Sequence, residues 1–562
     1  MKQPIAIGAE NYKDFIEKNA YYIDKTMMIK ELIDEASKVN LFTRPRRFGK
    51  TLTLSMVRTF FEDERTYEGE KIDNSRYFTG KKIRNAGERY TAAQGQYPVI
   101  KLSLKSAKQP DFQMAYNCLV SEIVGEYKRH RYILKSEKLL DVDKEQYNRV
   151  MNRCAEPDEY ATAIQFLSQC LKGYHEKNTI ILIDEYDVPL ENAYFKGFYE
   201  KMIDFIRSLF ESALKTNDAL EFAIVTGCLR ISKESIFTGL NNLKINSILS
   251  TSYAEYFGFT EAEVEQMLKN YELEEKLPEV KQWYDGYRFG KTEVYNPWSI
   301  INYVDTAVSN GEAYPKPYWS NTSSNSIVRE LVEEADSDTK EEIERLINGK
   351  TIEKPVHGEI TYADIHQSKD NLWNFLFFTG YLKVESSRFA NRKIYLTMSI
   401  PNDEVLTIYE DTIREWFDCQ VKAMDFTSFY HAMLVGDSSS MQKILKQNLR
   451  RTISYYDKKE AFYHGILTGY LMALPDYSIR SNREYGNGRP DLALVPYDEE
   501  EPVILIELKV CKKFTEMAEG CTAALAQIEE KGYAEPFLDK GYQKIIRYGI
   551  CFCEKTCMVE KG

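Results

Sequence analysis

Residues 44–51 read Arg-Pro-Arg-Arg-Phe-Gly-Lys-Thr, and they separate an apolar run ending at Phe42 from a helical run starting at Leu52. A strand, a tight loop ending in Gly-Lys-Thr and a helix are the parts of a P-loop, whose backbone N–H groups and helix N-terminus wrap a phosphate. In such a loop we expect Lys50 to reach the β and γ phosphates of a nucleotide and Thr51 to hold Mg²⁺. The other loop residues expected to bind the nucleotide are Arg46, Arg47, Phe48 and Gly49.

The loop departs from the standard P-loop pattern at its first position, where Arg44 replaces glycine. Pro45 follows, so the loop has to turn without the freedom at positive φ that glycine provides. By pattern alone, the stretch could equally be a basic loop between a strand and a helix. A second Gly-Lys-Thr, at residues 290–292, lacks both the apolar strand before it and the apolar helix after it, and we reject it.

A second element supports the P-loop interpretation. Residues 179–187 read Thr-Ile-Ile-Leu-Ile-Asp-Glu-Tyr-Asp, which is typical of a strand buried on both faces in a parallel sheet. Acidic residues at its carboxyl end point to the crevice where such sheets bind ligands. We expect Asp184 to hold Mg²⁺ through water and Glu185 to orient and deprotonate the attacking water. The two elements together predict ATP binding.

A further buried strand is expected over residues 221–227, with polar residues at its end. In an ATPase the strand beside the Asp-Glu strand carries a sensor of the γ phosphate, for which Thr226 and Arg230 are candidates. Arg230 as an ordinary surface arginine remains an equal alternative. One more short strand is expected over residues 247–253.

The composition limits the class of protein. A chain of 562 residues is too long for one core, so two to four domains are expected, and 43% apolar with 28% charged residues is ordinary for a globular protein. No apolar run suits a membrane span, and ten scattered cysteines fit free thiols in a reducing compartment, so we expect a cytoplasmic protein. A net charge of −12 argues against a basic coat but leaves room for a local basic groove.

Several motifs resemble those of the prokaryotic AAA-ATPase-like family: residues 24–26 (Asp-Lys-Thr), 44–51, 184–187, 237–243 (Phe-Thr-Gly-Leu-Asn-Asn-Leu), 283–289 (Trp-Tyr-Asp-Gly-Tyr-Arg-Phe) and 295–299 (Tyr-Asn-Pro-Trp-Ser). Its members are similar to P-loop ATPases of the STAND and archaeal AAA lineages, and their loop also lacks the first glycine. The resemblance covers roughly the first half of the chain and implies ATP binding and hydrolysis. Many members carry a PD-(D/E)XK nuclease domain at the C-terminus.

A second chemical centre is predicted near the C-terminus, where strands over residues 491–495 and 503–510 flank a polar turn. If the turn is centred on Glu499, paired residue numbers sum to 998 and Asp491 lies opposite Glu507. Lys509 shares the face of Glu507, because side chains alternate along a strand. Paired carboxylates bind Mg²⁺ or Mn²⁺, which activates water against a phosphodiester while a lysine stabilises charge.

Pro490-Asp491 with Glu507-Leu508-Lys509 resembles the PD-(D/E)XK nuclease signature. The surrounding pattern predicts the α-β-β-β-α-β order of that fold, from a helix opened by Glu460 to a closing strand over residues 545–552. The resemblance implies that Glu460 joins the metal site and that Gln527 is the accessory helix residue. A folded but catalytically idle module remains the alternative.

The sequence thus predicts an α/β chain in three parts: a P-loop parallel sheet flanked by helices (1–260), a mainly helical middle compatible with a lid or winged helix (261–440), and a restriction-endonuclease-like domain (441–562). The predicted function is an ATPase that controls a Mg²⁺-dependent nuclease acting on nucleic acid, with DNA favoured over RNA and a homo-oligomer left open. Alternatives are an ATP-dependent binding switch and a partner-remodelling ATPase. Basic and aromatic residues over 443–459 suit nucleic-acid contact or a solvated helix face equally well.

Overall fold

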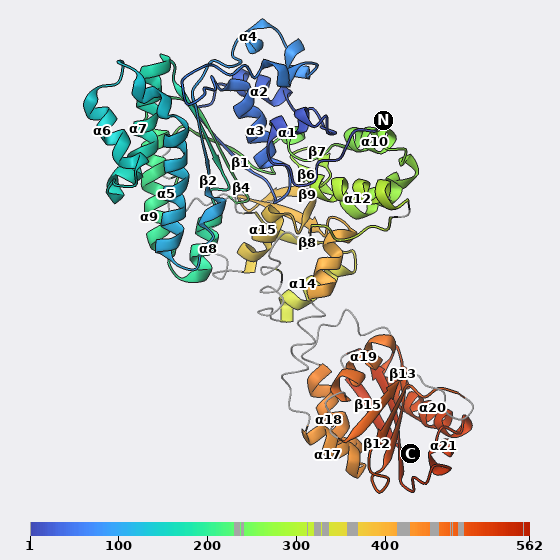
Figure 1. Cartoon of the computed structure of the whole chain (residues 1–562). Coiled ribbons are helices and arrows are strands. Elements are labelled where there is room, and N and C mark those ends of the chain that lie inside the picture. Colours follow the sequence, from blue (N-terminus) through green and yellow to red (C-terminus); the bar gives the residue numbers. More distant parts are fainter. Residues whose placement is uncertain are drawn as a thin grey trace. The chain divides into compact units, whose positions relative to one another are not determined.

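The computed structural model of the chain divides into two compact units, one of residues 1–325 with 351–408 and one of residues 326–350 with 409–562 (Figure 1). The structure describes residues 2–229, 236–237, 241–311, 313–319, 328, 337–356, 369–412, 427–449, 460–471, 474, 476–481, 488–554 and 556–562. None of the described helices is long and apolar enough to cross a bilayer.

The first unit is built on a five-stranded sheet in the order β2-β3-β4-β1-β5, with every neighbouring pair parallel. The strands are β1 (Val39–Thr43), β2 (Val99–Ser103), β3 (Thr179–Asp184), β4 (Leu220–Gly227) and β5 (Leu243–Asn246). Every residue of β1 and β3 is buried, as expected for strands covered on both faces. The predicted α/β fold is confirmed.

The prediction of a strand over residues 247–253 is wrong, because those residues form turns. The fifth strand, β5, lies just before that segment, and its pairing with β1 ends at Phe42 and Asn246. The chain then turns, and the Ser250 N–H donates to the carbonyl oxygen of Ser247 at 3.0 Å. This hydrogen bond within the turn takes the place of strand pairing, and Leu249 is exposed there.

Helices cover both faces of this sheet. Figure 1 shows α5 (Phe112–Arg129), α7 (Pro157–His175) and α9 (Tyr199–Phe210) on one side, and α2 (Met27–Glu35) and α3 (Lys50–Phe61) on the other. The remaining helices of this region are α1 (Tyr12–Glu17), α4 (Glu88–Thr91), α6 (Asp141–Met151) and α8 (Val188–Lys196). Helices connect β2 to β3 and β3 to β4, because two neighbouring parallel strands cannot be joined by a tight turn.

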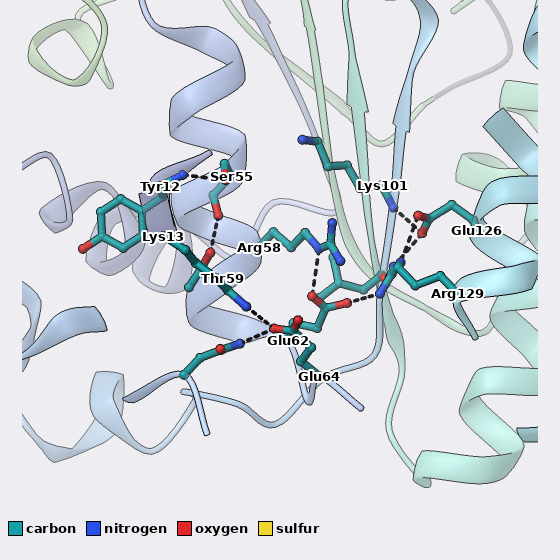
Figure 2. A network of polar contacts seen from close by, with 12 residues as sticks. Tyr12, Lys13, Ser55, Arg58, Thr59, Glu62, Glu64, Lys101, Glu126 and Arg129 are labelled. Atoms are coloured by element: carbon teal, nitrogen blue, oxygen red, sulfur yellow. Dashed lines mark hydrogen bonds and ion pairs between the residues drawn. The ribbon is translucent and has the colours of Figure 1, made fainter. Parts of the chain in front are cut away.

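A buried network of charges holds the C-terminal end of α3 to β2 and α5 (Figure 2). Glu62 accepts hydrogen bonds from Arg58, at 2.8 Å, and from Arg129. Glu126 accepts from Arg129 and from the backbone N–H of Lys101. Burial opposes ionisation of Glu62, but Arg129 and Arg58 outweigh it and lower its pKa to about 2. The helix that follows the P-loop is therefore anchored at its far end.

The middle of the chain contains strands as well as the expected helices. Its helices are α10 (Glu261–Asn270), α11 (Leu277–Tyr284), α12 (Pro297–Asn310), α14 (Ser337–Ile347) and α15 (Lys369–Thr379). A hairpin joins β6 (Tyr287–Phe289) and β7 (Thr292–Val294), and a sheet in the order β8-β10-β9 joins β8 (Ile352–Pro355), β9 (Lys383–Ala390) and β10 (Lys393–Ser399). A mainly helical middle is thus an incomplete description, because β9 is largely exposed and lacks the apolar alternation that reveals a strand. The predicted lid or winged helix stays a prediction.

The second unit has a sheet in the order β11-β12-β13-β14-β15, in which β13 and β14 are parallel and the other pairs antiparallel. The strands are β11 (Tyr477–Ser481), β12 (Leu492–Pro496), β13 (Val503–Val510), β14 (Ile545–Cys553) and β15 (Thr556–Lys561). The predicted hairpin register is confirmed, because Leu492 pairs with Ile506 and Leu494 with Ile504. The strand β15 extends the predicted order.

Helices pack on both faces of this second sheet. One apolar core joins it to α17 (Thr427–Val435), α18 (Ser438–Leu449) and α19 (Glu460–Leu471). Another joins β12 and β13 to α20 (Met517–Glu530) and α21 (Glu535–Leu538). The helix α17 lies upstream of the predicted boundary at residue 441, and residues 261–311 share a compact unit with the P-loop sheet. The three-part division stays a prediction.

Candidate functional sites

The loop between β1 and α3 is fixed at both of its ends. At its start the Arg44 N–H donates to the carbonyl oxygen of Gly227 on β4 at 3.0 Å. At its end Gly49 adopts a φ of 80° and caps the N-terminus of α3. Lys50 folds back so that its Nζ donates to the carbonyl oxygens of Arg44, at 3.0 Å, and of Pro45, at 2.9 Å. The loop is thus anchored at both ends, and Lys50 is held against the carbonyl groups of its first two residues, an arrangement typical of a phosphate-binding loop.

Arg44 occupies the first position of the loop with its side chain turned into the protein. The residue is fully buried, and its Nη1 donates to the carbonyl oxygens of Thr43, at 2.9 Å, and Asn246, at 2.6 Å. Its guanidinium lies 5.1 Å from the ring centroid of Phe257 and 4.9 Å from that of Phe289. Burial lowers the pKa of Arg44 to about 9. The arginine thus fills the space beneath the loop, and this loop closes with no glycine at that position.

Polar side chains from three elements meet at the carboxyl edge of the first sheet. The Thr51 hydroxyl donates to Oδ2 of Asp184 at 2.6 Å, and the Thr226 hydroxyl donates to Oδ1 of the same carboxylate. A hydroxyl at the start of α3 beside a carboxylate at the end of β3 is an all-oxygen pair that suits Mg²⁺ beside a nucleotide phosphate. The sequence-predicted residues Thr51, Asp184 and Thr226 are therefore in contact.

Glu185 follows β3 in a left-handed conformation, with a φ of 52°. Its N–H donates to the Thr226 hydroxyl at 3.4 Å. Burial raises the pKa of Glu185, and nearby Lys50 works against that rise. A carboxylate held in a strained backbone conformation with a raised pKa is a suitable proton acceptor for water.

A cavity of about 340 Å³ lies over this edge. Its polar end is lined by the loop residues Arg46, Arg47, Phe48, Gly49, Lys50 and Thr51, and by Glu185 and Asp187. Its apolar side is lined by residues that include Ile5, Tyr21, Phe259, Met267, Trp298 and Ile301. The volume, with one charged end and one aromatic and aliphatic side, suits a nucleotide whose base leaves water. Of the predicted nucleotide residues, Arg230 lies outside the described part of the chain.

Two residues at this cavity, Lys25 and Trp298, were given no role there from the sequence. Arg47 stacks over Trp298 on α12, with 4.4 Å between the guanidinium carbon and the ring centroid. Lys25 forms an ion pair with Glu263 at 2.6 Å and lines the cavity. Lys25 and Trp298 both lie within stretches, residues 24–26 and 295–299, on which the family resemblance rests. That resemblance was the signal by which they could have been found.

The second cluster lies on the C-terminal sheet. The Asp491 N–H donates to Oε2 of Glu507 at 3.3 Å, and Oδ2 of Asp491 accepts the Leu508 N–H at 2.8 Å. Nζ of Lys509 lies 3.3 Å from Oε1 of Glu507 and 2.8 Å from Oε1 of Gln527 on α20. The Gln527 amide in turn donates to Glu507. The four residues predicted from two strands and a helix are thus joined by hydrogen bonds.

Electrostatics mark Glu507 as the unusual member of this cluster. It is 2% exposed, and burial, followed by the neighbouring charge of Asp491, raises its pKa to about 7. Two adjacent carboxylates with one lysine leave negative charge that a divalent cation would offset, and their oxygens are the ligands that Mg²⁺ prefers. The donor chemistry therefore fits the metal that the sequence predicts.

The remaining predicted ligand is Glu460, which begins α19 as expected, although its side chain lies outside the described part. Among the described residues, no group of three or more His, Cys, Asp or Glu side chains is arranged to hold a metal ion. His464 was not predicted. It stands one helical turn after Glu460, and its Nε2–H donates to the backbone carbonyl of Asp491 at 3.0 Å. That contact ties α19 to the cluster.

The first sheet and its loop define a P-loop nucleotide-binding fold, and the second sheet with its carboxylate cluster defines a nuclease-like fold. Comparison with known families agrees: residues 6–237 match a family described as "Predicted AAA-ATPase" and residues 458–562 match the PD-(D/E)XK nuclease superfamily. The chain therefore carries an AAA-ATPase-like domain followed by a PD-(D/E)XK nuclease superfamily domain.

A relative resembles the chain over nearly its whole length. It is described as "Uncharacterized protein in vnfD 5'region" and comes from Azotobacter chroococcum mcd 1. It is 23% identical over 559 residues, which cover 96% of this chain and 95% of the relative. The similarity therefore includes both domains and the segment between them.

Proposed function

We propose that this protein binds and hydrolyses ATP and thereby controls a divalent-metal-dependent nuclease that cleaves phosphodiester bonds in nucleic acid, DNA more readily than RNA. The observation that carries the proposal is the cluster of Asp491, Glu507, Lys509 and Gln527, in which the buried carboxylate of Glu507 and the half-buried carboxylate of Asp491 meet a lysine. Such a set suits a metal and a phosphate better than it suits packing, because two adjacent carboxylates, one of them buried, are costly without cations to offset their charge.

At the nucleotide site, the loop N–H groups and Lys50 would bind the phosphates, while Thr51 and Asp184 would hold Mg²⁺. Glu185 would accept the proton of the attacking water. The Thr226 hydroxyl donates to Asp184 and so holds that carboxylate beside Thr51. The aromatic and aliphatic side of the cavity would receive the base.

At the nuclease site, Asp491, Glu507 and Glu460 would hold Mg²⁺ or Mn²⁺. When bound, the metal lowers the pKa of a water molecule and stabilises charge on the phosphate. Lys509 would donate to that water or to the phosphate oxygen, and Gln527 fixes the direction of the Lys509 ammonium through its own contact at 2.8 Å. In this proposal the three acidic residues bind the metal, and the lysine stabilises the charge that develops on the phosphate.

A second candidate function is an ATP-dependent binding switch or partner-remodelling ATPase with an idle nuclease module. It is favoured by the finding that, within the described residues, Asp491 and Glu507 are not joined by a third His, Cys, Asp or Glu ligand. In that case ATP would be hydrolysed while nucleic acid is bound or a partner rearranged without cleavage.

The test uses the full-length protein with single- and double-stranded DNA and RNA, Mg²⁺ or Mn²⁺, and with or without ATP. We expect cleavage to be lost in Glu507→Ala and altered in Lys50→Ala. The chain supplies matched controls: Glu501→Ala in the turn of the same hairpin, and Lys291→Ala in the second Gly-Lys-Thr, should behave as wild type. Absence of cleavage on every substrate with ATP hydrolysis intact would favour the second candidate function.

A further inference from the structure

The segment that follows β4 is held by the two residues that follow the Asp-Glu pair. Oδ2 of Asp187 accepts the backbone N–H groups of Cys228, at 2.7 Å, and Leu229, at 3.0 Å. The Tyr186 hydroxyl donates to the carbonyl oxygen of Leu229 at 2.6 Å. Three side-chain hydrogen bonds therefore fix the backbone of two consecutive residues just beyond the sheet.

This attachment is buried and closely packed. Tyr186 is 0% exposed and Asp187 is 3% exposed. A Cβ placed on Gly227 would lie 2.5 Å from the Tyr186 ring and 2.9 Å from Oδ1 of Asp187, so only glycine fits there. The Tyr186 N–H also donates to the carbonyl oxygen of Thr226 at 3.0 Å. The ends of β3 and β4 are thus joined residue by residue.

The segment held in this way faces the phosphate end of the cavity. Cys228 lines the cavity, and its Sγ lies 3.8 Å from Nζ of Lys50. Asp187 lines the same cavity. Burying a carboxylate costs several kcal/mol unless hydrogen bonds offset it, and here two backbone N–H groups do so. The buried carboxylate of Asp187 therefore lies close to Lys50, and the Cys228–Leu229 backbone that it holds is placed to affect the position of the reacting phosphate.

We propose that Asp187, supported by Tyr186, is a positioning residue for ATP hydrolysis: it holds the Cys228–Leu229 backbone against Lys50 and so sets the geometry around the γ phosphate. The inference rests on the proposed ATPase function and adds to it, because nucleotide binding depends on the loop and the cavity, whereas turnover depends on this attachment as well.

The test measures steady-state ATP hydrolysis by the full-length protein and its variants. For Asp187→Ala we expect kcat to fall at least about tenfold, because displacing groups near reacting atoms by 1 Å costs up to about a hundredfold. KM should change by less than about threefold, because the contacts that bind substrate remain. Asp187→Asn should recover most of kcat, since its amide oxygen can accept the same two N–H groups.

A readout independent of activity follows from Cys228. Burial raises the pKa of its thiol to about 11, so alkylation should be slow in the wild type. Releasing the segment in Asp187→Ala should expose the thiol and speed its alkylation, which peptide mass spectrometry resolves from the other cysteines. A matched control is Glu126→Gln, which alters another buried carboxylate that accepts a backbone N–H, from Lys101, away from the cavity. It should lower the melting temperature without lowering kcat.

Each outcome decides the inference. An Asp187→Ala variant with wild-type kcat, or with KM raised as far as kcat is lowered, would overturn it, as would equal defects in Asp187→Ala and Asp187→Asn. If Asp187→Ala does not fold, Tyr186→Phe decides, because the phenyl ring keeps its packing while the hydrogen bond to the Leu229 carbonyl is lost. A fall in kcat of about threefold or more supports the inference, and a smaller fall or none refutes it. Failure of the wild type to hydrolyse ATP would instead refute the proposed function.

Discussion

Replacing Glu507 by glutamine should stabilise the nuclease domain while abolishing its activity. The folded protein raises the pKa of this carboxyl to about 7 from an ordinary value of 4.5. A carboxyl whose pKa is higher in the folded state loses stability as pH rises from about 4.5 to 7, and above pH 7 the full cost applies. At about 1.4 kcal/mol for each pH unit, that cost is at most ~3.5 kcal/mol.

Glutamine removes the charge but keeps an acceptor for one of the donors, so we expect Glu507→Gln to gain about 1 to 3 kcal/mol at pH 8 and little at pH 5. The assay is native-state hydrogen exchange on full-length protein, read on peptides from β13 and β14. Added Mg²⁺ should increase protection in the wild type and leave Glu507→Gln unchanged, because metal bound only to the folded state stabilises it.

The matched control is Glu501→Gln in the turn between β12 and β13, which should alter neither stability nor cleavage. If Glu507→Gln is less protected than the wild type at pH 8 and pH 5 alike, then the carboxylate is a structural partner of Lys509, and the interpretation of this cluster as a metal site is refuted.

Two further predictions concern buried charges in the first unit. Glu404 is fully buried, and burial raises its pKa to about 7, so Glu404→Gln should raise the melting temperature at pH 8 and not at pH 5; an equal effect at both pH values would contradict this. Arg44→Lys keeps the charge beneath the P-loop but loses the planar stacking between Phe257 and Phe289, so it should destabilise the protein by about 1 to 3 kcal/mol in thermal unfolding. Unchanged melting of Arg44→Lys would show that charge alone suffices there.

The sequence by itself predicted most strands of both sheets and the residues of the two candidate sites. Strands buried on both faces carry continuous apolar runs, and the Gly-Lys-Thr loop between a strand and a helix predicts a P-loop once the strand that leads into Asp184 and Glu185 is considered with it. The hairpin register, and with it the pairing of Asp491 with Glu507, followed from the position of one turn, since side chains alternate along a strand. These features are local, so neighbouring residues reveal them.

Only the tertiary structure showed which residues from distant parts of the sequence meet at the nucleotide site. The apolar side of the nucleotide cavity brings together residues as distant as Ile5, Met267 and Ile301, and no spacing in the sequence relates them. The same holds for the contact of Asp187 with Cys228 and for the place of Arg44 between two aromatic rings. The strands of the middle region were also hidden, because β9 is exposed and carries little apolar signal. Contacts between distant segments depend on how elements pack, and packing energy is shared among many side chains without a local pattern.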